Sequence, residues 1–166
     1  LNLMRDEKPD IVVVVGADHV YRMDFSQMVT QHVASGAACT VAAIRQPIEL
    51  ADQFGVIDVD PEDPSRIRDF LEKPKDPAVL DSLRIPPALL TELGLPADAD
   101  RYQASTGIYV FTREALVKTL DNDHLDFGKH AIPDAIHKMR VMAYVYQGFW
   151  EDIGTIRSFY ETNLSL

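Results

Sequence analysis

Five consecutive β-branched residues at positions 11–15 lead directly into a short polar loop that carries Asp18. Polar residues do not alternate with the apolar ones, and this pattern is typical of a strand that is covered on both faces in a parallel α/β sheet. Open α/β sheets bind their ligands beyond the carboxyl ends of the strands. Asp18 is therefore a candidate ligand-binding residue, and capping of its own loop explains an aspartate at this place equally well.

The composition is that of one ordinary globular domain. The 166 residues are 46% hydrophobic and 25% charged, and a domain of this length buries about 70% of its unfolded surface. The net charge of -10 argues against a nucleic-acid or anionic-membrane partner, since both need clustered lysines and arginines, but it leaves open a local basic pocket for one phosphate. The single cysteine, Cys39, excludes an internal disulfide and a cysteine metal cluster, and we expect it in the core.

The absence of targeting segments and the start of the chain lead to two further expectations. No apolar run approaches the roughly 20 residues of a membrane helix, and no signal peptide opens the chain, so we expect a cytoplasmic protein. The chain starts at Leu1 rather than at methionine, and its first strand begins only at residue 11. We therefore expect a piece of a longer protein.

Local signals predict an alternation of strands and helices. Asp24 is a predicted N-cap for a helix that Gly36 ends, and strand 39–44 follows, so strand, helix and strand form a predicted parallel βαβ unit. The strands predicted at 54–60 and 67–72 flank a polar turn and form a hairpin. Five prolines mark residues 73–101 as a surface excursion with a short helix near 88–93. Later elements are predicted as strand 103–111, a helix at 113–120 capped by Thr112, a helix after Asp126, strand 141–146 and a last helix capped by Thr155.

Several residues could carry chemistry, and each also has a structural explanation. Glu72 and Lys73 place opposite charges at a strand end before a proline, where an exposed charge pair is about as plausible as a binding site. Ser105 could present a hydroxyl to a ligand, but serine before a strand is also common turn chemistry. Asp152 stands between Trp150 and a glycine, which favours a site over a solvated loop. For His19 and Asp24 the structural roles are favoured. His19 is expected to bond to a backbone carbonyl of its loop, and Asp24 is expected to cap the helix that follows it.

Motifs of several other enzyme classes are absent from the sequence. There is no Gly-x-Ser-x-Gly elbow, no His-Glu-x-x-His, no Gly-x-Gly-x-x-Gly and no phosphate loop that ends in Lys-Ser/Thr. Hydrolase triads, zinc proteases, dinucleotide cofactors and Walker-type phosphate sites therefore have no support.

Six segments together resemble the motifs of the sugar-nucleotide pyrophosphorylases, and specifically the ADP-glucose branch, the glucose-1-phosphate adenylyltransferases. Their order and spacing hold across nearly the whole chain, although each motif alone is weak. They are residues 16–24 (Gly-Ala-Asp-His-Val-Tyr-Arg-Met-Asp), 54–57 (Phe-Gly-Val-Ile), 70–74 (Phe-Leu-Glu-Lys-Pro), 105–111 (Ser-Thr-Gly-Ile-Tyr-Val-Phe), 126–129 (Asp-Phe-Gly-Lys) and 150–156 (Trp-Glu-Asp-Ile-Gly-Thr-Ile).

The resemblance implies a fold and an activity. The implied fold is a Rossmann-like, GT-A-like nucleotidyltransferase with a mixed, mainly parallel sheet flanked by helices and incomplete at its N-terminus. The implied reaction joins ATP and α-glucose 1-phosphate into ADP-glucose and pyrophosphate, which feeds glycogen synthesis. The resemblance also implies a homo-oligomer, which in the family is a tetramer.

The resemblance also implies roles for six residues. Asp18 and Asp152 would be the catalytic carboxylates that hold Mg²⁺. Lys73 would grip the phosphate of glucose 1-phosphate, while Glu72, Ser105 and the backbone at Gly55 would contact the sugar. Two carboxylates and a lysine suit a reaction in which catalysis is mainly positioning and charge neutralisation.

The chain also departs from the family pattern. We expect residues 1–166 to be the C-terminal part of the catalytic domain, because the Gly-rich nucleotide loop that normally precedes it and the left-handed β-helix that follows it have no counterpart here. A fragment of this kind is expected to be inactive alone. Two alternatives stay open, namely a sister enzyme that uses dTTP, UTP or GTP, and a non-catalytic regulatory subunit. Retention of Asp18, Lys73 and Asp152 argues against the second.

Overall fold

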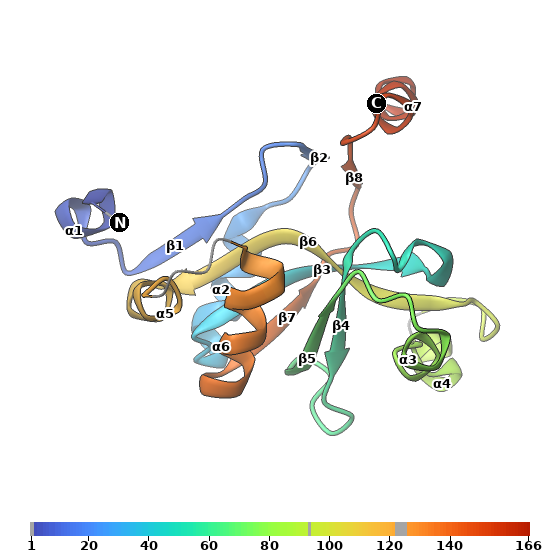
Figure 1. Ribbon diagram of the computed structural model, residues 1–166, viewed down its shortest axis with the longest axis horizontal. Helices are drawn as coiled ribbons and strands as arrows, with labels where there is room; N and C mark the ends of the chain where they lie inside the picture. Colours follow the sequence, from blue (N-terminus) through green and yellow to red (C-terminus); the bar gives the residue numbers. More distant parts are fainter. Residues whose placement is uncertain (1, 93, 122–125) are drawn as a thin grey trace.

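The computed structural model describes residues 2–92, 94–121 and 126–166 (Figure 1). Six of its strands form one sheet with the order β5-β4-β6-β3-β7, and β1 pairs with β6 in addition. The six strands are β1 (Ile11–Val14), β3 (Cys39–Pro47), β4 (Gly55–Val59), β5 (Ile67–Glu72), β6 (Arg101–Thr112) and β7 (Val141–Val145). None of the described helices is long and apolar enough to span a membrane.

The mixed α/β sheet is confirmed, but the expectation of mainly parallel pairing needs correction. Among the described strands only β3 and β7 pair in parallel, whereas β6 runs antiparallel to β1, β3 and β4. The long strand β6 lies between β1 and β3. The βαβ connection therefore keeps β1 and β3 parallel without making them neighbours, because the rule for such crossovers fixes direction and handedness and does not fix adjacency.

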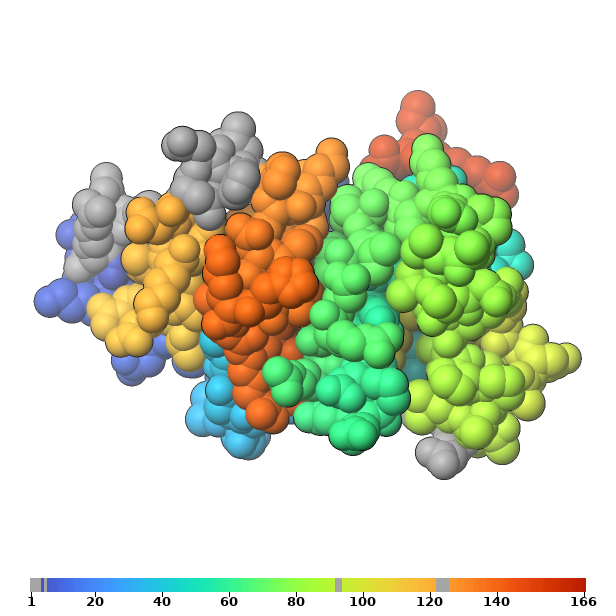
Figure 2. All heavy atoms as spheres, turned by 60° about the horizontal axis from the view of Figure 1, so that its bottom comes forward, coloured from blue at the N-terminus to red at the C-terminus, as the bar shows by residue number. Residues whose placement is uncertain are grey.

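Helices cover both faces of this sheet, so that its strands bury both sets of alternating side chains. One face packs against α5 (Arg113–Thr119) and α6 (Ile132–Lys138), and the other packs against α2 (Phe25–Ser35). In β6, Tyr109 and Phe111 belong to the first core, and Ile108 and Val110 belong to the second. Figure 2 shows α6 beside the hairpin of β4 and β5, which it contacts. The predicted core position of Cys39 is confirmed.

Strand β1 is less covered than its apolar sequence predicts. The side chains of Val13 and Val15 are 38% and 47% exposed, and within the described residues β1 pairs with β6 alone. Burial on both faces, inferred from the run at 11–15, is therefore not observed for these two side chains.

The predicted helix boundaries are confirmed where a capping side chain marks them. Asp24 accepts a hydrogen bond from the Ser26 amide (3.0 Å) at the start of α2, and Gly36 ends this helix in the left-handed conformation, with φ 62°. Thr112 caps α5 in the same manner. Thr155 caps α7 (Ile156–Ser165) through a reciprocal bond with Ser158. These bonds satisfy amides that have no partner within the helix, which explains why local sequence fixes the boundaries.

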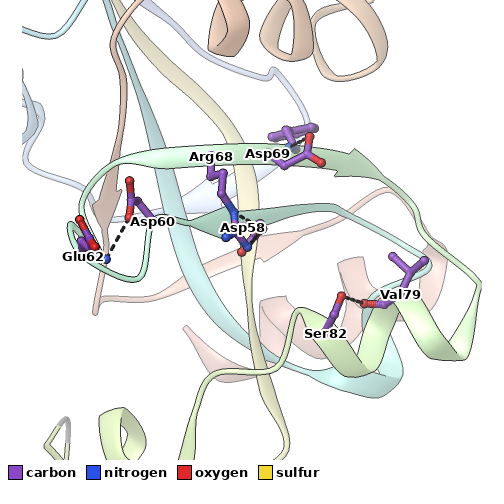
Figure 3. A network of polar contacts seen from close by, with 8 residues as sticks. Asp58, Asp60, Glu62, Arg68, Asp69, Val79 and Ser82 are labelled. Carbon is purple, nitrogen blue, oxygen red and sulfur yellow. Dashed lines mark hydrogen bonds and ion pairs between the residues drawn. The ribbon is translucent and has the colours of Figure 1, made fainter.

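The predicted hairpin of β4 and β5 is also confirmed, with Gly55 opposite Glu72 and Ile57 opposite Phe70. Its polar turn is held by side chains that bond to nearby groups (Figure 3). Arg68 donates from Nε to Asp58 across the two strands (2.9 Å), and Asp60 accepts from the Glu62 amide (2.9 Å). The turn is also tied to β7, because the amide of Ala143 donates to the carbonyl oxygen of Ser65 (2.7 Å).

The remaining segments surround the sheet. They are α1 (Asn2–Glu7), the 3-10 turn η1 (Ile48–Leu50), α3 (Pro77–Ser82), α4 (Pro87–Glu92) and the π-helical turn η2 (Phe127–Ala131), which leads directly into α6. The excursion predicted for residues 73–101 thus holds two short helices, and residue 93, the predicted end of the second, lies outside the described residues. A separate two-stranded sheet joins β2 (His19–Tyr21) to β8 (Trp150–Asp152), as Figure 1 shows. Neither of these short strands is among the elements predicted from the sequence.

Candidate active site

Five of the six residues proposed from the sequence line one cavity of about 590 Å³. The cavity lies where β1 ends, next to the end of β5 and the middle of β6. Its lining includes Asp18, Gly55, Glu72, Ser105 and Asp152. The outermost of these residues, Asp18 and Asp152, are more than 130 positions apart in the sequence. The fold therefore gathers them into one place, and Lys73 is the one proposed residue that does not line the cavity.

The pairing of β2 with β8 brings the two proposed metal ligands together. His19 lies opposite Asp152 in this antiparallel ladder, and the amide of Ile153 donates to the carbonyl oxygen of Asp18 (3.2 Å). The Asp152 carboxylate is itself held by the Gly154 amide (2.7 Å). Two backbone contacts thus fix the relative positions of the loops that carry the carboxylates, while the Asp18 side chain stays 70% exposed.

Asp18, His19 and Asp152 form a cluster of possible metal donors, with one ligand atom of each within 4.8 Å of the others. Mg²⁺ binds oxygen ligands at about 2.0–2.1 Å, so two oxygens on opposite sides of the ion lie about 4.2 Å apart. The observed limit of 4.8 Å is close to this span, and the exposed Asp18 side chain has the freedom to make up the difference. The two carboxylates therefore fit a hard cation in both chemistry and separation.

The ring of His19 occupies the wall between the carboxylates and Trp150. Its centroid lies 4.9 Å from the Trp150 ring, its Nε2 is 3.5 Å from Asp18 Oδ1, and its buried Nδ1 has no hydrogen-bond partner among the described residues. A Cβ added at Gly16 would come within 2.8 Å of this ring. His19 is thus packed against the site, which differs from the loop histidine with a satisfied backbone contact that the sequence favoured.

The carboxylate of Glu72 lies between two glycines. A Cβ on Gly128 would approach Glu72 Oε2 to 2.7 Å, and a Cβ on Gly55 would approach it to 3.1 Å. Burial raises the pKa of the Glu72 carboxyl, and the positive charge of Lys73 partly offsets this rise. No ion pair to Glu72 is made within the described residues. A half-buried carboxylate without such a partner is well placed to accept hydrogen bonds from a ligand.

Replacing Gly55 by alanine is expected to destabilise the fold. The added Cβ would lie 2.3 Å from the tip of the Phe70 ring, which is 4% exposed and belongs to the buried core, so that the ring or the backbone would have to shift. Overpacking of this kind costs about 1–3 kcal/mol in the free energy of unfolding. Urea denaturation measures this loss. Gly55→Ala in a Phe70→Leu background is the control, because the ring tip that the added Cβ meets is absent there, and an equal loss in both backgrounds would contradict a packing origin.

Ser105 and its neighbours form the floor of the cavity. The Ser105 hydroxyl accepts from the Gly107 amide (3.2 Å), and the Thr106 hydroxyl donates to the carbonyl oxygen of Ala42 in β3 (3.0 Å). Burial raises the pKa of Tyr109 to about 12, and its ring stacks on Phe127 with centroids 5.6 Å apart. A neutral hydroxyl and an aromatic stack thus line the part of the cavity next to Glu72.

Lys73 lies at the rim of the site. Its side chain is exposed, and its amide donates to the carbonyl oxygen of Phe54 (3.0 Å). The backbone of Lys73 has a φ of 51°, a left-handed conformation that is disfavoured for residues other than glycine. In the described chain, the other non-glycine residue with a positive φ is Lys8, which also precedes a proline. Lys73 follows Glu72 directly and its charge acts on the Glu72 carboxyl, so it lies close to the cavity without lining it.

Sequence analysis gave no ligand role to several residues that the cavity contains. They are His19, Tyr109, Asp126, Phe127, Gly128 and Trp150. All six lie within segments that carried the family resemblance, either near a residue that was assigned a role or in the motif at 126–129, which was assigned none. The available signal was a short motif in which aromatic and small residues stand side by side. Such a motif is uncommon outside a core or a binding site.

Comparison with known proteins places this site in a family. The whole chain, residues 1–166, matches the family model described as nucleotidyl transferase. The chain belongs to the nucleotidyl transferase family. Curated relatives named glucose-1-phosphate adenylyltransferase include those of Leifsonia xyli subsp. xyli (45% identical), Arthrobacter sp. strain FB24 (46%) and Bifidobacterium longum strain NCC 2705 (40%).

The family match covers more of this chain than of its relatives. Each of these three alignments covers 100% of the chain but only 41%, 36% and 41% of the relative's own length, respectively. The chain therefore spans about two fifths of the nucleotidyl transferase relatives that it matches. The expected division into a preceding nucleotide-loop segment and a following β-helix domain stays a prediction.

Proposed function

We propose that the protein carrying this chain transfers an adenylyl group from ATP to α-glucose 1-phosphate, with release of pyrophosphate and formation of ADP-glucose for glycogen synthesis. The observation that carries this proposal is the cavity in which Asp18, Asp152, Glu72 and Ser105 meet in a nucleotidyl transferase chain. The relatives named glucose-1-phosphate adenylyltransferase support the choice of both substrates.

On this proposal the chain supplies the sugar side of the reaction. The Glu72 carboxylate accepts hydrogen bonds from hydroxyls of the sugar, and the Ser105 hydroxyl donates or accepts one, next to the narrow backbone at Gly55. Lys73 lies at the rim, where its charge neutralises the phosphate of glucose 1-phosphate. Holding this phosphate in place beside the α-phosphorus of ATP makes the attack effectively intramolecular, which is the main source of rate in phosphate transfer.

Asp18 and Asp152 are the proposed ligands of Mg²⁺. Their separation and exposure fit such an ion, and a bound Mg²⁺ would neutralise charge on the reacting phosphates. His19 is not a proposed ligand, because magnesium prefers oxygen ligands over imidazole. It supports the arrangement by packing between Asp18 and Trp150.

The test uses the complete protein that contains this chain. Mixing it with ATP, glucose 1-phosphate and Mg²⁺ should release pyrophosphate and produce ADP-glucose. A coupled assay measures the released pyrophosphate. Strong preference for dTTP, UTP or GTP would replace the adenylyl assignment with a sister activity. Sugar-phosphate binding in calorimetry without turnover on any nucleotide would exclude an enzyme of this class.

Lys73→Ala is expected to raise the KM for glucose 1-phosphate about tenfold with little change in kcat. A charge-assisted contact contributes about 1.5–3 kcal/mol, and the exposure of Lys73 places this contact at the lower end. Initial rates at varied glucose 1-phosphate measure both constants. Lys75→Ala removes the same charge two residues away and should leave KM unchanged, whereas equal effects of the two variants would remove Lys73 from the proposed site.

We also propose that the complete protein is a cytoplasmic homo-oligomer, a tetramer as in the family that it resembles. The support is the family resemblance. Light scattering of the purified complete protein would measure its mass, and a monomer at micromolar concentration would contradict this proposal.

A further inference from the structure

A second cavity, of about 370 Å³, is lined mainly by polar groups from the end of β3, the start of β6 and the segment after β7. Arg45, Gln46, Arg101 and Gln147 supply these groups. Among the described residues, Trp150 is the only one that lines both this cavity and the candidate active site. The cavity is therefore a separate place in the fold, and no role proposed above uses its arginines.

The two arginines of this cavity lie close together across the β3–β6 ladder. Arg45 is opposite Gln103, and Arg101 is opposite Pro47. Arg45 and Arg101 are therefore diagonal neighbours on the same face of the sheet, at a distance that long side chains bridge. Two guanidinium groups that share a cavity repel each other unless an anion lies between them.

Neither arginine has a partner within the described chain. Arg68, Arg84, Arg140 and Arg157 each pair with a carboxylate, whereas the side chains of Arg45 and Arg101 make no ion pair and no hydrogen bond to any described residue. Other described arginines, such as Arg113, also lack an ion pair, but Arg45 and Arg101 share one cavity. The Nε of Arg45 is fully buried without an acceptor, and burial lowers the pKa of this guanidinium. A chain with 26 acidic residues thus leaves two neighbouring cations unpaired in a cavity.

We propose that this cavity binds a small oxyanion of the phosphate class, held by Arg45 and Arg101. The planar guanidinium donates two parallel hydrogen bonds to phosphate oxygens, and two such groups match the charge of about −1.5 to −2 that a phosphate monoester carries at pH 7. A carboxylate carries half of this charge. Gln147, in the segment after β7, also lines the cavity, and its side-chain amide is a further possible donor.

The size of the cavity fits this class of ligand. Its volume is far larger than the roughly 30 Å³ that one water molecule occupies, so it has room for phosphate and for an attached organic group. Free phosphate and a phosphate monoester share the same recognition by the two arginines, and an experiment with both distinguishes them. The proposal goes beyond the proposed transferase reaction and does not depend on it.

Isothermal titration calorimetry of the complete protein with inorganic phosphate, at constant ionic strength, tests this site. The titration uses the Lys73→Ala background, which weakens the phosphate contact proposed for the active site. We expect saturable binding of phosphate. Arg45→Gln and Arg101→Gln should each lower the affinity of this binding by about tenfold or more. Arg113→Gln is the matched control, because it removes the same charge at the opposite end of β6.

Further measurements keep the result interpretable. Arg45→Lys retains the charge and should retain part of the affinity, and thermal unfolding verifies that each variant is folded. A parallel titration with glycerol 3-phosphate identifies the source, since tighter binding of the ester favours a phosphorylated metabolite and tighter binding of phosphate favours the free ion. The proposal is overturned if phosphate shows no saturable binding, or if its affinity is unchanged in both Arg45→Gln and Arg101→Gln.

Discussion

Asp152→Asn in the complete protein is expected to lower kcat for pyrophosphate release by about 10²- to 10⁴-fold. The asparagine keeps the shape of the side chain and its bond from the Gly154 amide, but it removes the negative charge of one of the two carboxylates in the cluster of Asp18, His19 and Asp152. Stabilisation of charge by a bound cation contributes several kcal/mol to the transition state, and each 1.36 kcal/mol is a factor of ten in rate.

A dependence on Mg²⁺ separates this effect from simple damage to the fold. The half-saturating Mg²⁺ concentration should rise in Asp152→Asn, because a neutral amide oxygen is a weaker ligand than a carboxylate. Asp24→Asn is the matched control. It makes the same chemical change at an exposed carboxylate outside the cavity, and asparagine is as good an N-cap as aspartate. A kcat for Asp152→Asn within threefold of the unchanged enzyme would exclude Asp152 from the reacting centre.

Features that depend on neighbouring residues were predictable from the sequence. Asp24, Thr112 and Thr155 cap the helices that follow them, and the hairpin around residues 61–65 forms as its turn residues predict. In each case the deciding interactions are hydrogen bonds within a few residues, so the local sequence contains the information that determines the structure.

Features that depend on distant segments were not predictable in the same way. The three-residue strands β2 and β8 are too short to show a periodic pattern, and they are strands because they pair with each other. The position of β6 between β1 and β3 follows from long-range pairing that no local signal records. The exposure of Lys73 and the position of Glu72 between two glycines likewise depend on how three segments meet at the cavity.

Glu72→Gln is expected to stabilise the fold at neutral pH while it weakens binding of glucose 1-phosphate about 10- to 100-fold. The amide has one acceptor oxygen in place of two and no charge, so hydrogen bonds from sugar hydroxyls to the carboxylate are lost or weakened, and bonds to a charged group contribute about 1.5–3 kcal/mol. Calorimetric titration with glucose 1-phosphate measures the loss. Glu62→Gln, in the exposed hairpin turn, is the control and should retain full affinity.

The gain in stability follows from the direction of the pKa shift. Burial raises the pKa of the Glu72 carboxyl above its ordinary value, so the folded state binds this proton more tightly than the unfolded state. The contribution of Glu72 to the free energy of unfolding therefore falls as pH rises from the ordinary pKa through the raised one. Above that window the buried charge destabilises the wild-type fold, and Glu72→Gln avoids this cost.

The melting temperature of Glu72→Gln should accordingly exceed that of the wild type at pH 7, and the difference should close as pH falls below the ordinary pKa of a glutamate, where both side chains are neutral. Thermal unfolding from pH 4 to pH 8 measures this difference, and the other titrating groups cancel because both proteins contain them. A lower melting temperature for the variant at pH 7 would mean that ionised Glu72 stabilises the fold. In that case the carboxylate is a structural ion, and its position between Gly55 and Gly128 serves the fold and does not serve a sugar.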